Sequence, residues 1–320
     1  MSHIKIILLN LQLCLMGFNS FSQTTYLTEK LGKYVYRNNL EWKGTDYITF
    51  GKNAKIVADY FQQSIPLMKA NKGFDLDVIL FGVGTDDYLN KKWNYGLRGE
   101  LVFRFQLFLK DAAGKEGKWT IEPPNWRLFV NNTETGHGGM LNQGNEGSFL
   151  KELFLVFPLV KEIAPGVHYF GRACNSLVVF NPDRPDYWLP VTVREVVDAK
   201  LKYYLETDKF IYDFIKPLTD KMSEAELNAP AFNESDDGIL NVNGKGQGLQ
   251  IMRFNPEYWD RSLHPSTIQF LSLNYAEYDS EFEQKIAEEE YLKNNGRINY
   301  SKEVMKSLTF KELIKLVQKK

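Results

Sequence analysis

The sequence contains very little cysteine and has no marked excess of charge of either sign. Cys14 and Cys174 are its two cysteines, and 39 Lys and Arg residues stand against 40 Asp and Glu residues in a chain of 320. Two cysteines exclude a disulfide-rich scaffold and a Cys-rich zinc site. The balanced charge argues against a nucleic-acid partner, because such proteins carry a clear basic excess. Stability must therefore come from a hydrophobic core, for which the chain is long enough.

Long apolar runs are also missing, apart from one at the N-terminus. Residues 6–18 are mostly apolar, and Ser20 and Ser22 supply the small residues that a signal peptidase requires. The run is shorter than the about 20 residues that cross a bilayer. We predict a signal peptide over residues 1–22 and a mature chain that begins at Gln23 and has no transmembrane segment. The mature protein is expected in the periplasm, at the cell surface or in the extracellular space.

The scarcity of cysteine also indicates the kind of compartment to which the protein is exported. Cleavage of the leader leaves Cys174 as the single cysteine of the mature chain, which excludes an internal disulfide. Export without disulfides is more typical of a bacterial envelope than of a eukaryotic secretory route. We therefore interpret the Asn-x-Ser/Thr sequons at Asn131, Asn233 and Asn299 as chance matches and not as glycan sites.

Strand and helix periodicities are both present, which predicts an α+β fold. Several segments alternate or concentrate apolar side chains over short lengths, as strands with a buried face do, and turns between them favour antiparallel sheets. The expected strands cover residues 75–82, 97–110, 126–130, 249–255 and 267–274.

Long helices are expected to pack against these sheets. Asn53 can cap a helix over residues 54–70, and Gly73 would end it. A capping box of Thr192 and Glu195 opens a long helix near residues 192–220. Three further capping boxes start later helices, at Ser223 with Glu226, Ser280 with Glu283 and Thr309 with Glu312.

A polar, glycine-rich segment at residues 131–147 suggests a boundary near residue 150. We predict an N-terminal α+β subdomain over residues 23–150, a second one over 151–279 and a helical tail over 280–320. The two subdomains are possible relatives of each other, because one short motif occurs twice.

That motif is a strand that runs into Phe-Asn-Pro, followed by an acidic residue, a Tyr-Trp pair and a proline. Its copies lie at residues 178–190 and 252–265. Asn-Pro initiates a turn at a strand end. The large rings beside it either cover the core or stand exposed to bind a sugar or a peptide. The candidate ligand-binding residues are Tyr187, Trp188, Tyr258 and Trp259.

Catalytic and metal-binding signatures are sparse. The histidines at positions 137, 168 and 264 do not show the His-Glu-x-x-His spacing of a zinc helix, and the chain has no Gly-x-Ser-x-Gly nucleophile motif. Cys174 is interpreted as a buried thiol, and the glycines at residues 244–248 as a flexible connection that binds no phosphate. No metal site and no cofactor are expected. The best catalytic candidates are Glu134, His137 and Glu146, in the glycine-rich segment.

These observations favour an exported, noncatalytic binding or envelope-associated protein, whose ligand is a sugar, a peptide or a protein surface. The aromatic content of 14% supports a recognition role. One alternative is an extracytoplasmic hydrolase that uses Glu134, His137 and Glu146. Another is a structural partner of an envelope protein, bound through the tail helices that follow Ser280. Whether the protein is an enzyme stays open from sequence alone.

Overall fold

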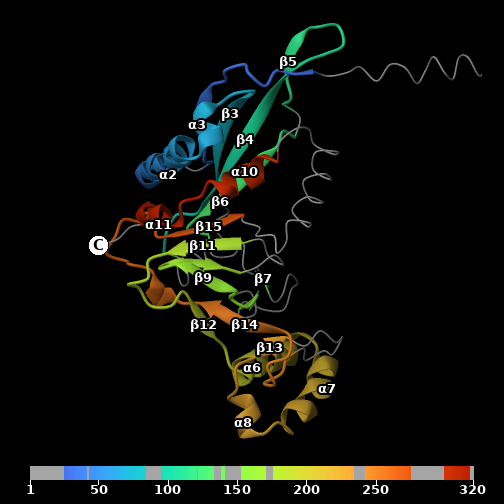
Figure 1. The fold of residues 1–320 in the computed structure, drawn as a ribbon. Helices are drawn as coiled ribbons and strands as arrows, with labels where there is room; N and C mark the ends of the chain where they lie inside the picture. Colours follow the sequence, from blue (N-terminus) through green and yellow to red (C-terminus); the bar gives the residue numbers. More distant parts are fainter. Residues whose placement is uncertain are drawn as a thin grey trace, which may run out of the picture.

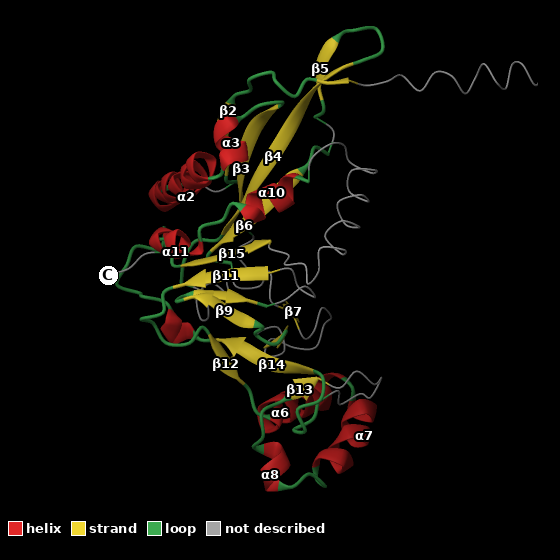
Figure 2. Cartoon of the chain, in the orientation of Figure 1, coloured by secondary structure: helices red, strands yellow, loops and turns green. Residues whose placement is uncertain are grey.

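A computed structural model describes residues 25–41, 43–83, 95–120, 122–132, 138–140, 153–170, 176–233, 242–274 and 299–317. Within these residues the chain combines helices and strands, as the α+β prediction requires (Figures 1 and 2). The predicted signal peptide lies outside the described residues. None of the described helices is both long enough and apolar enough to cross a bilayer.

The strands form a large sheet and a small sheet. The large sheet has the order β2-β3-β4-β6-β15-β11-β10-β9, with β1 and β5 also paired to β4. Its strands are β1 (Thr25–Tyr26), β2 (Tyr34–Asn39), β3 (Phe74–Gly82), β4 (Gly99–Lys110), β5 (Glu116–Lys118), β6 (Asn125–Val130), β9 (Lys161–Ala164), β10 (Val167–Tyr169), β11 (Ser176–Phe180) and β15 (Phe270–Asn274). All these pairs are antiparallel except β2 with β3, which are parallel.

The small sheet has the order β12-β14-β8-β7, and β13 pairs with β14. Its strands are β7 (Gly138–Met140), β8 (Leu153–Val156), β12 (Trp188–Pro190), β13 (Phe232–Asn233) and β14 (Leu249–Phe254). It lies between the β9–β11 end of the large sheet and a group of three helices at the bottom of Figure 1.

The helices are divided between the two sheets (Figure 2). α2 (Thr45–Ser64), α3 (Pro66–Ala70), α10 (Tyr300–Lys306) and α11 (Phe310–Leu313) contribute side chains to one hydrophobic cluster with the large sheet. α6 (Val193–Thr207), α7 (Lys209–Thr219) and α8 (Glu224–Leu227) form the group beyond the small sheet. The short 3-10 helices η1 (Pro256–Tyr258) and η2 (Ile314–Leu316) complete the described elements.

Alternation along the strands builds a second cluster between the two sheets. On β11, Leu177 and Val179 face the helices, whereas Val178 and Phe180 face the small sheet. On β14, Met252 and Phe254 face the large sheet, whereas Ile251 packs with residues of α6. This aromatic layer consists of Phe154, Val156, Phe170, Val178, Phe180, Tyr187, Trp188, Phe254, Tyr258, Trp259 and Phe270. It joins the sheets by burying apolar and aromatic surface from both.

The boundary expected near residue 150 does not divide the large sheet. β6 lies before this position and β15 lies after it, yet Leu128 of β6 pairs with Leu273 of β15. Strands from both expected subdomains therefore share one sheet. The pairing of β6 with β15 could not be predicted from the sequence, because these segments lie about 140 residues apart.

Two helix predictions need correction. α2 begins at Thr45, not at residue 54, because its buried face already includes Phe50, one turn before Ala54. The predicted helix is also divided at Ile65, whose backbone is extended before Pro66, and α3 ends at Ala70, with Asn71 as its C-cap, and not at Gly73. Asn53 lies inside the helix, where its Nδ2 donates to the backbone oxygen of Ser266 at 2.9 Å.

The expected long helix is divided at Asp208, whose side chain accepts from Ile211 N and caps α7. The capping boxes that open α6 and α8 are present as predicted. The one predicted at Thr309 is wrong, because α11 begins after Thr309 without a side-chain capping hydrogen bond, and the one at Ser280 lies outside the described residues.

Three segments are fixed to one another by Asn131, directly after β6. Its side chain is fully buried, and its Nδ2 donates to the backbone oxygens of Leu97 (3.1 Å) and Thr267 (2.9 Å). Its Oδ1 accepts from the backbone amides of Gln269 (2.8 Å) and Phe270 (3.1 Å). All hydrogen-bonding positions of the amide are thus occupied. This sequon asparagine is a structural clamp in the folded protein.

Asn131→Ala is expected to lower the free energy of unfolding by about 3–5 kcal/mol, measured by urea denaturation. Four hydrogen bonds are lost, and alanine must adopt the left-handed conformation of this residue (φ 51°). Asn131→Gly loses the same bonds but tolerates that conformation, so it should be about 1 kcal/mol less destabilising. Equal losses in the two variants would contradict this account.

Candidate ligand-binding site

The two Phe-Asn-Pro segments form the same local turn at the ends of β11 and β14. Asn181 Oδ1 accepts from the backbone amide of Asp183 at 3.0 Å, and Asn255 Oδ1 accepts from that of Glu257 at 3.0 Å. In both, the Asn side chain bonds the amide two residues further on, as in an Asx-turn. The repeated motif is therefore a repeated strand-end corner, although its strands belong to different sheets.

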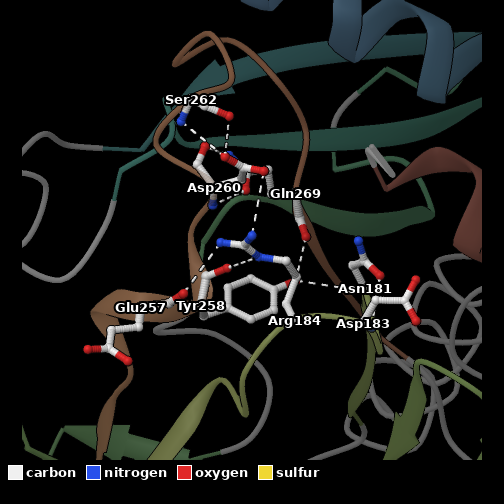
Figure 3. Close-up of polar contacts among 8 residues, drawn as sticks. All are labelled: Asn181, Asp183, Arg184, Glu257, Tyr258, Asp260, Ser262 and Gln269. Carbon is white, nitrogen blue, oxygen red and sulfur yellow. Dashed lines mark hydrogen bonds and ion pairs between the residues drawn. The ribbon is translucent and has the colours of Figure 1, made fainter.

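The two corners are bonded to each other through Arg184 and Tyr258 (Figure 3). Arg184 Nε donates to the backbone oxygen of Tyr258 at 2.9 Å, and its guanidinium lies 3.5 Å from the carboxylate of Asp260. The Tyr258 hydroxyl donates to the backbone oxygen of Gln269 at 2.6 Å and accepts from Asn181 N at 3.3 Å. Burial raises the pKa of this phenol, which therefore stays protonated and able to donate.

Asn255 holds the backbone that precedes β12. Its backbone amide donates to the oxygen of Tyr187 at 2.8 Å, and its Nδ2 donates to the oxygen of Asp186 at 2.7 Å. The corner after β14 thus fixes the position of residues 186 and 187, which form part of a cavity wall.

The four rings of the Tyr-Trp pairs are buried, which agrees with the alternative that they cover the core and contradicts the alternative of an exposed platform. Tyr258 and Trp259 are 1% and 2% exposed, and Tyr187 and Trp188 are 4% and 8% exposed. Each ring contacts other aromatic residues of the layer between the sheets, which accounts for its burial. Tyr258 and Trp259 have a packing role. Tyr187 and Trp188 lie at the margin of the layer, beside a cavity.

This cavity has a volume of about 430 Å³ and lies at one edge of the aromatic layer. Two segments, residues 156–159 and 186–188, form part of its wall. The other described lining residues are His168 of β10, Phe170 directly after it, Phe232 of β13, Gly248 just before β14, and Gln250 and Met252 of β14. Six of the lining residues are aromatic: Phe157, His168, Phe170, Tyr187, Trp188 and Phe232. Pockets that bind small molecules have this size and this mainly apolar lining with few polar groups.

The polar side of the cavity is formed by His168, Tyr187 and Asp186. A hydrogen bond of 2.7 Å joins His168 Nδ1 to the Tyr187 hydroxyl. Burial lowers the pKa of the imidazole, and burial raises the pKa of the phenol well above its usual range. Both groups are therefore uncharged near neutral pH, and Asp186 supplies a carboxylate beside them.

The other sequence candidates do not join this site. Glu134, His137, Glu146 and Cys174 lie outside the described residues. His264 lies elsewhere and bonds Ser266 Oγ at 2.8 Å. Within the described ranges, no three His, Cys, Asp or Glu residues are grouped so that they could hold a metal ion.

Sequence reasoning missed His168 as a site residue, together with Phe170 and the β14 positions Gln250 and Met252. The signal was alternation: Gln250, Met252 and Phe254 are spaced by two and share one face of β14. The sequence does not reveal that this face meets the large sheet.

Comparisons with models of known protein families, with curated proteins and with solved structures return no match. The geometry of the cavity is therefore the basis of the functional argument.

Asn255→Ala is expected to lower the free energy of unfolding by about 2 kcal/mol, because two side-chain hydrogen bonds are lost at a buried position. Asn181→Ala removes the corresponding turn bond at the other corner, and about 1 kcal/mol is expected there. Urea denaturation of both variants gives the comparison. A cost at Asn181 that equals or exceeds the cost at Asn255 would refute the assigned role of Asn255.

His168→Gln tests the state of the imidazole. Because the folded pKa is lowered, the unfolded chain takes up a proton below about pH 6.5 that the folded chain does not. Its contribution to stability is thus complete above that pH and is lost as the pH falls toward the folded pKa. The slope cannot exceed about 1.4 kcal/mol per pH unit, and it is smaller for this half-buried ring. Urea denaturation between pH 7.5 and 5 should show a weaker pH dependence in the variant; an unchanged dependence would disprove the assignment.

Proposed function

We propose that the protein is an exported, noncatalytic binding protein that holds a small ligand in the cavity beside Tyr187 and Trp188. The observation that supports this most strongly is the cavity itself, with about 430 Å³ of space and six aromatic side chains in its lining. The proposed export depends on the N-terminal residues 1–22 of the sequence.

The composition of the wall supports the binding of an organic body with a polar end. Apolar side chains such as Met252 and Leu159 offer contact area to the body of a ligand. His168, Tyr187 and Gln250 offer hydrogen bonds that would orient it. The bonds from Asn255 to residues 186 and 187 hold part of the wall in place before a ligand arrives, which lowers the cost of binding.

A thermal-shift screen of the purified mature chain against small organic compounds, glycans and peptides tests this proposal. A ligand that binds the folded state raises the melting temperature by mass action. The compound that gives the largest shift is then titrated by calorimetry.

Leu159→Ala is expected to weaken binding of that compound by about three- to tenfold, because Leu159 lines the cavity. Val160→Ala is the matched control, since Val160 is its exposed neighbour and is absent from the described lining. Both side chains are exposed, at 46% and 59%, so neither truncation should disturb folding. If the two variants bind equally well, the ligand lies elsewhere and the proposed site is wrong.

A further inference from the structure

The described side chains that line the cavity include one acidic group and no basic Lys or Arg group. The acidic group is Asp186. Glu162 of β9 lies directly opposite His168 of β10 in the antiparallel pair, so both side chains occupy one face of the sheet. Lys161 pairs with Tyr169 and belongs to the opposite face, where its ammonium lies 5.9 Å from the ring of that tyrosine.

His168 does not offset this negative charge near neutral pH. Its imidazole is held uncharged by burial, even though Glu162 and Asp186 both act to raise its pKa. Asp186 therefore lines a cavity whose other described polar lining side chains are neutral, and Glu162 lies on the same face of the sheet as His168.

The aromatic side chains of the wall, like Asp186, favour a cationic ligand. The face of an aromatic ring attracts a cation, most strongly for Trp, and the attraction grows where water is excluded. Trp188, Tyr187 and Phe170 are each less than 10% exposed and line the cavity together. Aromatic rings and a carboxylate that line one cavity are complementary to an ammonium group on an apolar body.

We infer that the ligand of this cavity is an organic cation, an amine or quaternary ammonium compound with an apolar body, whose charge lies beside Asp186. This inference depends on the proposed binding function and adds the class of ligand. An anionic ligand would meet like charge at Asp186. A neutral ligand gains the apolar contacts and nothing from the carboxylate.

Calorimetric titration of the purified mature chain with matched probes tests the inference. The probes are phenethyltrimethylammonium, 2-phenylethylamine, the neutral 2-phenylethanol and the anionic 3-phenylpropanoate, each at up to millimolar concentration. At least one of the two cations is expected to bind about tenfold more tightly than the alcohol, and the carboxylate should bind most weakly.

Asp186→Asn should reduce the affinity for the cation by about two- to fivefold, because the carboxylate is exposed, and leave the affinity for the alcohol unchanged. The bond from Asn255 uses the backbone oxygen of residue 186, so the variant retains it. Asp183→Asn is the matched control: it removes the same charge from an exposed position of the same corner, outside the described cavity lining. It should leave the affinity for both probes unchanged.

Equal binding of the alcohol and both cations, or an equal loss in the two Asp variants, overturns the inference and leaves the binding function intact. No binding by any probe also overturns the inference. The proposed function then depends on the wider screen and on Leu159→Ala, which do not assume the charge of the ligand.

Discussion

The aromatic layer between the two sheets is the contact on which the rest of the structure depends. It buries side chains from β11 and β15 on one side and from β8, β12 and β14 on the other. Nondirectional burial of this kind fixes the distance between the sheets but does not by itself fix their position along each other. The two Phe-Asn-Pro corners fix this position, because directional hydrogen bonds of Arg184 and Tyr258 join one corner to the other (Figure 3). Hydrophobic packing thus sets the distance between the two sheets, and the polar contacts set their position along each other.

Local signals predicted local structure well. The capping boxes at Thr192 and Ser223 lie where the sequence indicated, because a cap involves residues only three positions apart. The strands β3, β4 and β6 also lie within predicted segments: β3 is a short, largely buried run, whereas β4 and β6 show alternation over part of their length. The break at Asp208 was missed because apolar periodicity continues on both sides of it, while the hydrogen bond to Ile211 N interrupts the helix at one residue.

These local signals could not predict which strands pair over long distances in the sequence. β2 lies parallel to β3, and β6 pairs with β15, a strand about 140 residues later. Neither choice can be derived from the residues of one segment, because register and neighbour are properties of the whole sheet. The Tyr-Trp pairs show the same limit. Sequence identified two copies of one corner, but only the packing of the sheets distinguishes Trp188, at the cavity margin, from Trp259, inside the layer.

The chemistry of the cavity follows from its place at that margin. In the middle of the layer the charge of Asp186 would be costly to bury, whereas on an open surface the pKa of His168 would lie close to its value in water. At the margin, burial favours the uncharged forms of His168 and Tyr187, while Asp186 remains exposed. The neutral pair has a hydrogen bond of its own and can offer a further one to a ligand without changing charge. Such a pair orients a bound group, and the neighbouring carboxylate then decides which charge that group can carry.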